Sequence, residues 1–256
     1  MSRRATFVPY RPKTILNKHK RADHWFWTRY SAYPYLGCQH GCEFCYCREQ
    51  KFSPYDDVDD FAYLIKVKEN APEKLRKALN RAKTDLIFTG DYQPAERKFE
   101  LSRKMLEVCL EQGFPVFVLE RSPLVLRDLD ILQDIQERAR AVVSFSIIST
   151  PDSQNYERIR QMERLAPPPS KRFAAMEKIA AAGILTGTSM MPILPGLCDD
   201  DANLESVVRW TADHGGRFVA AVRDRTYLGL QFHPERSGAS GLRVLDNFVS
   251  GVRRAA

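Results

Sequence analysis

The pattern that most limits the fold of this chain is an alternation of short apolar runs with longer amphipathic segments. The apolar runs are typical of buried strands, and they lie at residues 62–67, 85–90, 116–119, 141–148 and 185–194. The other segments carry apolar residues at helical spacing, and they lie at residues 72–82, 97–112, 126–138, 170–182 and 202–213. This order predicts an α/β fold of parallel β/α units, in the form of a partial (β/α) barrel.

Two polar features coincide with the expected ends of strands. A cluster of cysteines falls in the first predicted strand-to-helix loop, and Gly90-Asp91 ends the predicted strand at 85–90. Ligand sites in parallel β/α folds lie at the C-terminal ends of the strands. We therefore expect both features to open onto one face of the fold.

The cysteines are too few and too clustered for a disulfide framework. Four of the six lie within residues 38–47, and the other two, Cys109 and Cys198, stand alone. Such a cluster in a reducing compartment is typical of a metal-binding or catalytic site. We expect Cys109, which lies on an apolar helix face, to be a core residue.

Cys38, Cys42 and Cys45 form a Cys-x3-Cys-x2-Cys run that can surround a single centre. Thiolates suit soft metals and iron–sulfur clusters, and three thiolates leave one iron of a four-iron cubane open. The alternative is a structural zinc site with Cys47 or His40 as the fourth ligand. Zinc sites usually pair two separated knuckles, and this sequence has no second pair, so the spacing favours an iron–sulfur cluster.

The composition is that of a globular protein with a basic balance. The 256 residues have a net charge of +7 and a pI of about 9.1, and basic residues at the front are mixed with aromatic ones. This mixture suits a nucleic acid or another polyanion, although a solvated arm with a few core aromatics would give the same pattern. No apolar run approaches the ~20 residues that span a bilayer, and residues 1–21 lack the apolar segment of a secretory signal. We expect a cytoplasmic protein with no membrane partner.

The cysteine motif, with Phe44 before its last cysteine, resembles the signature of the radical S-adenosylmethionine (SAM) superfamily. The resemblance implies a radical SAM barrel and a [4Fe-4S] cluster on Cys38, Cys42 and Cys45. It also implies that the open iron chelates SAM, and that reduction cleaves SAM to methionine and a 5′-deoxyadenosyl radical. An electron donor such as flavodoxin or ferredoxin is then an expected partner. No catalytic residue beyond the cofactor sites is assigned.

Further stretches are similar to the spore photoproduct lyase-like subgroup of that superfamily. They occur in order between residues 31 and 214, at residues 33–38, 45–46, 89–94, 122–130, 143–147 and 192–196. Carried over by position, Gly90 and Asp91 would lie beside SAM, and Arg121 and Ser146 would contact it from later strands. The alternatives are a turn or helix-start role for Asp91 and an ordinary strand hydroxyl for Ser146.

The chain departs from this subgroup at two places. Glu120-Arg121-Ser122 stands where many relatives have Thr-Lys-Ser, and Thr89 stands where the lyase has its hydrogen-donating cysteine. A threonine hydroxyl holds its hydrogen too strongly to replace a thiol. Repair of a thymine photoproduct is therefore not expected, unless Cys47 substitutes as the donor rather than being a spare buried thiol. The substrate is unknown, with a nucleic acid or nucleotide preferred.

The end of the chain resembles a different family. The run Gln231-Phe-His-Pro-Glu235 and its surroundings are similar to the C-terminus of class I glutamine amidotransferases, in particular the glutaminase subunit of imidazole glycerol phosphate synthase. In that family, residues matching His233 and Glu235 act with a cysteine on a sharp strand-to-helix elbow. This chain has no such elbow, so the tail is interpreted as a remnant or fusion without glutaminase activity.

These features predict three parts: a basic N-terminal extension at residues 1–30, a radical SAM core at 31–214 and an amidotransferase-like tail at 215–256. Residues 1–30 are expected to be irregular. The tail is expected to form strands at 218–222 and 228–232 and a helix that buries Leu245 and Phe248, all packed onto the core. A non-catalytic, metal-stabilised nucleic-acid-binding protein is the alternative to an enzyme.

Overall fold

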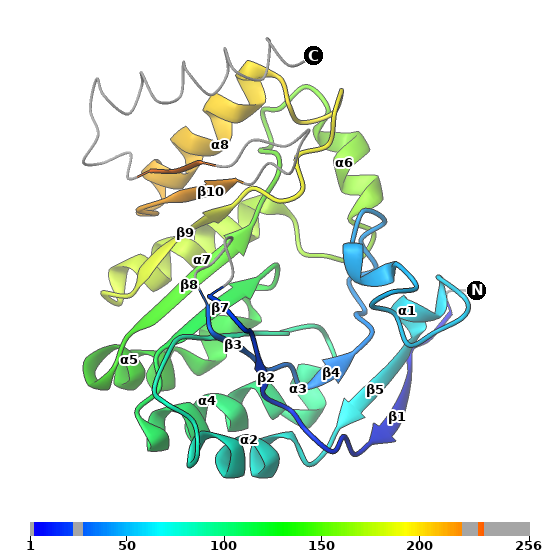
Figure 1. Cartoon of the computed structure of the whole chain (residues 1–256). Coiled ribbons are helices and arrows are strands. Elements are labelled where there is room, and N and C mark those ends of the chain that lie inside the picture. Colours follow the sequence, from blue (N-terminus) through cyan, green and yellow to red (C-terminus); the bar gives the residue numbers. More distant parts are fainter. Residues whose placement is uncertain (1–2, 23–27, 222–229, 233–256) are drawn as a thin grey trace. The chain divides into compact units, whose positions relative to one another are not determined.

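The computed structural model describes residues 3–22, 28–221 and 230–232 (Figure 1). The chain divides into two compact units. The first comprises Met1–Val142 and Met162–Ala166, and the second comprises Val143–Gln161 and Pro167–Ala256. Within the described residues, no helix is both long enough and apolar enough to cross a membrane.

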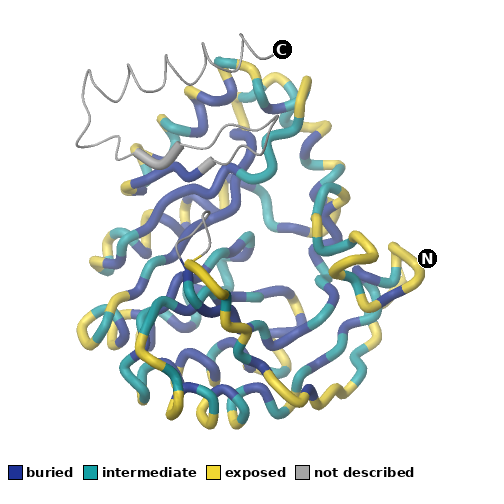
Figure 2. Tube along the Cα trace, in the orientation of Figure 1, coloured by how far each residue is buried: buried dark blue, intermediate teal, exposed yellow. Residues whose placement is uncertain are grey.

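The first unit contains a run of strands in the order β7-β6-β3-β2. Strands β3 (Tyr30–Ser31), β6 (Ile87–Thr89) and β7 (Val116–Glu120) pair in parallel, and β2 (Asn17–Lys18) is antiparallel to β3. Helices α2 (Ala71–Leu79), α4 (Leu101–Gln112) and α5 (Leu129–Arg138) pack successively beside one another. Strands β6 and β7 are mainly buried, as Figure 2 shows for β7, in keeping with their nearly continuous apolar sequences.

A second, smaller sheet of this unit has the order β1-β5-β4. Strand β5 (Leu64–Lys68) pairs in parallel with β1 (Thr6–Tyr10) and antiparallel with β4 (Tyr35–Leu36). Its alternate residues Ile65 and Val67 are buried against Tyr35, Ala95 and Leu101. This half-buried alternation is that of a sheet with one packed face.

The small sheet corrects two expectations. Residues 1–30 are not irregular throughout, because Thr6–Tyr10 forms the edge strand β1. The strand expected at 62–67 starts at Leu64 and lies in the small sheet rather than in the parallel series, and the short helix α1 (Asp60–Tyr63) precedes it.

The helix expected at 97–112 is divided in two. Helix α3 (Glu96–Phe99) ends at Glu100, whose φ of 51° is left-handed, and α4 begins at Leu101. The buried carboxylate of Glu96 accepts hydrogen bonds from the backbone N–H groups of Ser102 and Arg103, at 3.0 and 3.4 Å. These bonds satisfy donors in the first turn of α4 and account for the break. The helix expected from residue 126 likewise begins earlier, as a 3-10 turn (η2, Pro123–Asp128) that leads into α5.

The second unit holds most of β8 (Ala141–Ser146), followed in the sheet by β9 (Leu185–Ser189), β10 (Val219–Ala221) and β11 (Leu230–Phe232). Helices α7 (Pro169–Ala181) and α8 (Asp201–Asp213) pack on β9, and α6 (Tyr156–Met162) lies earlier in the chain. The helices predicted at 170–182 and 202–213 are confirmed as α7 and α8, and each begins one residue earlier than predicted. The strand expected at 185–194 is shorter and ends at Ser189.

The start of the predicted tail continues this sheet. Strand β10 pairs in parallel with β9, and β11 pairs antiparallel with β10. Gly187 in β9 permits the approach, because an added Cβ would lie 2.3 Å from the carbonyl oxygen of Phe218. The predicted helix with Leu245 and Phe248 lies outside the described residues.

The fold is thus a mixed α/β structure with parallel strands, as predicted. The partial barrel and the three-part division of the chain stay predictions.

Candidate metal centre

The cysteine loop, defined here as residues 37–45, follows β4 in the first unit. Gly37 has a φ of 82°, and Gly41 a φ of 59°. The N–H of Cys38 donates to the carbonyl oxygen of Phe61 at 2.8 Å, and the N–H groups of Gly41 and Cys45 donate within the loop to Cys38 and Cys42. The loop therefore holds its three cysteines by tight turns that two glycines permit.

The three thiols lie close enough to influence one another. Burial raises the pKa of Cys38, and Asp91 and the Cys42 thiol raise it further. The pKa of Cys45 is lowered, chiefly because the Cys47 thiol donates a hydrogen bond to its sulfur, with Arg121 contributing. A thiolate is the ligand form of cysteine, so this environment favours Cys45 as a ligand.

The donor set fits the cofactor that the motif implies. Cys38, Cys42 and Cys45 present three sulfur donors from one short loop, which suits an iron–sulfur cluster. Among the described residues, no group of three or more His, Cys, Asp or Glu side chains is placed to hold a metal ion. The ligands of one ion converge on one point, whereas the thiolates of a cubane bind separate irons. The fit therefore rests on the chemistry and proximity of the three thiols.

Residues 162–166 hold the cysteine loop from a distant part of the sequence. The N–H of Glu43 donates to the carbonyl oxygen of Met162 at 2.9 Å, and the N–H of Leu165 donates to that of His40 at 3.1 Å. An ion pair of 3.1 Å joins Arg164 to Glu43. The backbone bonds fix the path of the loop more than the exposed ion pair does.

Arg121, at the end of β7, lies beside the cysteine loop. Its guanidinium pairs with Glu163 at 2.5 Å and lies 5.2 Å from the centre of the Phe44 ring. Burial acts to lower the pKa of Arg121, but the nearby Cys42 thiol and the Glu163 carboxylate outweigh this and raise it. A fixed cation thus stands next to the three thiols, where it can stabilise negative charge on them.

Gly90 and Asp91 form a strained turn after β6. Both have positive φ values, 134° and 104°. The carboxylate of Glu120 lies inside this turn and accepts hydrogen bonds from the N–H groups of Asp91 and Tyr92. Glycine is required at position 90, because an added Cβ would meet the Glu120 carboxylate at 2.6 Å. Burial raises the pKa of Asp91 to about 7 and that of Glu120 to about 8.

A buried amide, which the sequence did not single out, joins the two loops. Gln93 is fully buried; its Nε2 donates to the carbonyl oxygen of Gly37 at 3.0 Å and to Oδ1 of Asp91 at 2.8 Å. Its Oε1 accepts a hydrogen bond from the N–H of Gln39 at 3.0 Å. Gln93 therefore ties the cysteine loop to the Asp91 loop, defined here as residues 90–93.

Lys68 adds a partly buried charge near Asp91. Its Nζ donates to the carbonyl oxygen of Tyr33 at 2.7 Å. Burial lowers the pKa of Lys68 to about 8, while the Asp91 carboxylate acts to raise it. Nothing in the sequence marks this residue, because an alternating strand places charged side chains outside more often than inside.

The other residues of interest have local partners. Ser146 lies in the second unit, where its hydroxyl donates to the carbonyl oxygen of Met191 at 3.2 Å, as the strand-hydroxyl alternative requires. The Thr89 hydroxyl donates to Ala32 at 2.8 Å. Cys109 is a core residue, as predicted, and burial raises its pKa to about 12. His233 and Glu235 lie outside the described residues.

The first unit thus brings together Cys38, Cys42, Cys45, Asp91 and Arg121, around a loop suited to soft metal ligation. Comparison with known proteins assigns the chain to a family. The family model described as the Radical SAM superfamily matches residues 33–205. The chain belongs to the radical SAM superfamily, a family of enzymes that implies a [4Fe-4S] cluster and SAM.

Two relatives that match most of the chain are uncharacterized proteins. An uncharacterized protein of Mycobacterium tuberculosis is 27% identical over 199 residues, which are 75% of this chain and 57% of that protein. An uncharacterized protein of Methanocaldococcus jannaschii is 26% identical over 172 residues, 67% of this chain and 62% of that protein. The chain therefore spans about three fifths of the length of these relatives. No solved structure gives a significant match.

A short segment is similar to a different protein. The imidazole glycerol phosphate synthase subunit HisH of Caulobacter vibrioides is 56% identical over 48 residues, which are 19% of this chain and 22% of that subunit. This likeness covers too little of either protein to assign the chain to that family.

Proposed function

We propose that this chain is a radical SAM enzyme of the spore photoproduct lyase-like subgroup, and that it acts on a nucleic acid or nucleotide. The observation that carries the proposal is the cysteine loop, whose three thiols lie beside Arg121 and near Asp91. When bound, the reduced [4Fe-4S] cluster supplies the electron that cleaves SAM to methionine and a 5′-deoxyadenosyl radical.

The residues of the chain prepare that chemistry. Cys38, Cys42 and Cys45 would hold three irons and leave the fourth for the amino and carboxylate groups of SAM. Arg121 offsets the negative charge of the thiolates, and Asp91 offers a carboxylate near the same place. Gln93 keeps the two loops together. Ser146 is the residue proposed to contact SAM from β8.

Thr89 supports a reaction other than photoproduct repair. Its hydroxyl is buried and donates to the carbonyl oxygen of Ala32, so it offers no weak hydrogen at the position of the lyase cysteine. Cys47 is the alternative thiol close to the cysteine loop, and its hydrogen bond to Cys45 favours a supporting role there. The tail is proposed to be an amidotransferase remnant without glutaminase activity, and flavodoxin or ferredoxin to be the electron donor in a cytoplasmic setting.

Cleavage of SAM tests the reaction class. We expect the anaerobically reconstituted chain, given dithionite and SAM, to form 5′-deoxyadenosine and methionine, as measured by liquid chromatography and mass spectrometry. The Cys42→Ala variant should form neither. A chain that holds its full iron but forms no 5′-deoxyadenosine would contradict the proposal and leave the non-catalytic binder as the better account.

Salt-dependent binding tests the substrate class. Deleting the basic N-terminus would remove strand β1, so exposed charges are the better target. We expect a variant with Lys13, Lys18 and Lys20 changed to Gln to bind single-stranded DNA more weakly, with a plot of log K against log salt that is flatter by about 2. The matched control changes three exposed basic residues of the second unit, Arg158, Lys171 and Lys178. Nucleic acid would no longer be the preferred substrate if both variants lost affinity for single-stranded DNA equally, or if the parent chain did not bind it at low salt.

A further inference from the structure

Two buried carboxylates of the first unit lie outside the metal centre. Glu96 and Asp128 are both 0% exposed. Asp128 belongs to residues 122–130, one of the stretches similar to the spore photoproduct lyase-like subgroup. The proposed function gives this stretch no role. Buried charges are costly unless they are paired, so their partners indicate what they do.

Glu96 holds the strand that leads into the cysteine loop. The Tyr35 hydroxyl donates to Oε2 of Glu96, and Tyr35 itself is only 2% exposed. Tyr35 lies in β4, two residues before Gly37. The same carboxylate accepts the two backbone hydrogen bonds at the start of α4 described above. Glu96 therefore connects β4 to a helix of the core.

Asp128 holds the Asp91 loop in the same way. The Tyr92 hydroxyl donates to Oδ2 of Asp128 at 2.9 Å, and Tyr92 is 1% exposed. Tyr92 follows Asp91 directly, and its N–H is bound by Glu120. Arg103 of α4 also donates to Asp128, at 3.1 Å. Both the backbone and the ring of Tyr92 are thus fixed.

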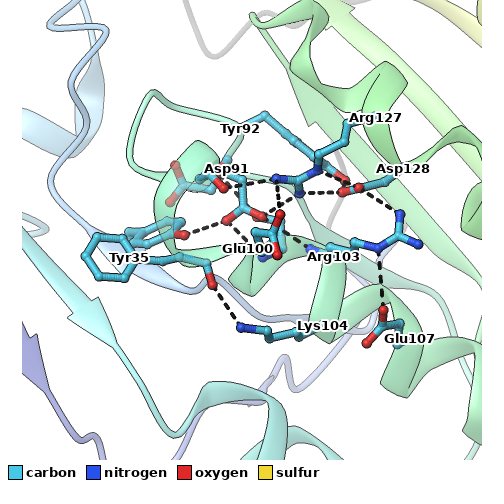
Figure 3. A network of polar contacts seen from close by, with 12 residues as sticks. Tyr35, Asp91, Tyr92, Glu100, Arg103, Lys104, Glu107, Arg127 and Asp128 are labelled. Atoms are coloured by element: carbon cyan, nitrogen blue, oxygen red, sulfur yellow. Dashed lines mark hydrogen bonds and ion pairs between the residues drawn. The ribbon is translucent and has the colours of Figure 1, made fainter.

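Arg127 joins the two carboxylates. Figure 3 shows its contact with Asp128. Its Nη2 donates to Glu96 at 2.8 Å and to Asp128 at 2.8 Å, and its Nε donates to Asp128 at 2.7 Å. Its Nη1 donates to the backbone carbonyl oxygen of Glu96 at 3.0 Å. A guanidinium can make these bonds together because its donors form a rigid planar fork, which an ammonium lacks.

Stability alone is a weak reason for such a network. Replacing a buried ion network with apolar residues of similar volume is often neutral or stabilising, so specificity of geometry is the better explanation. Here the two tyrosines lead from the network to the two loops of the candidate metal centre. We propose that Arg127 is a positioning residue, which acts through Glu96–Tyr35 and Asp128–Tyr92 to fix the cysteine loop and the Asp91 loop relative to each other. The importance of Arg127 for catalysis rests on the proposed function, whereas its effect on the positions of the two loops does not.

Hydrogen–deuterium exchange of the full, iron-loaded chain tests the proposal. We expect Tyr35→Phe to speed exchange about tenfold in residues 37–45, Tyr92→Phe to do so in 90–93, and Arg127→Met to do so in both. Arg127→Lys should restore part of the protection. The control is Arg76→Met, which removes a bidentate pair with Glu111 on the surface of the same unit. If Arg127 only stabilised the fold, the Arg127→Met variant would exchange faster throughout the first unit.

SAM affinity supplies a second readout, measured by equilibrium dialysis. We expect Tyr92→Phe to keep its iron and to bind SAM about tenfold more weakly, with Arg76→Met unchanged. The positioning role would be overturned if exchange rates in both loops were unchanged. It would also be overturned if Tyr35→Phe, Tyr92→Phe and Arg127→Met all raised the exchange rate equally across the whole unit. If the parent chain binds no SAM, the proposed function fails, and the exchange pattern still decides the proposal about Arg127.

Discussion

The Cys42→Ala variant is expected to lose most of its iron and its brown colour after anaerobic purification. Each of Cys38, Cys42 and Cys45 would supply a thiolate to a different iron, and two remaining thiolates hold a cubane poorly. The parent chain should contain about four irons, and each of the three Ala variants should contain well under half of that, as measured by inductively coupled plasma mass spectrometry.

Cys47→Ala is the matched control for this loss. Cys47 lies in the 3-10 turn η1 (Tyr46–Arg48), and its thiol donates a hydrogen bond to the Cys45 sulfur. We expect the variant to keep its iron, because the ligand thiolate remains. Loss of iron from Cys47→Ala equal to that from Cys42→Ala would instead indicate a fourth protein ligand, as in the structural zinc alternative.

Gly37→Ala is expected to have the second largest effect. The residue has a φ of 82°, and an added Cβ would lie 2.8 Å from the carbonyl oxygen of Leu64 and 2.9 Å from that of Phe61. The left-handed backbone costs about 1–2 kcal/mol, and the clash adds about 1–3 kcal/mol because the obstacles are backbone atoms. The variant should unfold at lower denaturant concentration and incorporate less iron.

Gly113→Ala separates the cost of the left-handed backbone from the cost of the clash. Gly113 has a similar φ of 68°, but an added Cβ would meet only the Arg138 side chain, at 3.8 Å. We expect it to lose about 1–2 kcal/mol and to keep its iron. If denaturant titrations showed that Gly37→Ala and Gly113→Ala lower the free energy of unfolding equally, the crowding at Gly37 would not contribute.

The sequence predicted the features that local spacing encodes. The cysteine run could be read directly, because its ligands are near neighbours in the chain. The apolar strands β6, β7 and β8 and the helices α4, α5 and α7 were recovered, because their periodicity and the glycines after α4 and α7 are local signals. Helix α6 was not predicted.

Features that depend on tertiary partners were missed. Thr6–Tyr10 is short, contains Pro9 and is flanked by basic residues, and it forms a strand only because β5 offers an edge. Gln93, Glu96 and Glu120 are polar residues of types that are mostly exposed, and nothing in their neighbours marks them as buried. Each also has a partner tens of residues away, namely Gln39, Tyr92 or Arg127, and only the fold reveals these contacts.

The end of β7 supports both loops of the candidate metal centre. Glu120 lies inside the turn of Gly90-Asp91, and Arg121, the next residue, pairs with Glu163 beside the cysteine loop. Adjacent residues at the end of β7 thus hold two different loops.

Electron paramagnetic resonance of the dithionite-reduced chain, recorded before and after addition of SAM, tests whether the three cysteines hold a cluster that binds SAM. We expect the signal of a reduced [4Fe-4S] cluster in a sample with about four irons per chain, and a change in that signal when SAM binds at the open iron. Zinc in place of iron after anaerobic reconstitution, or a cluster signal that SAM leaves unchanged, would contradict this expectation.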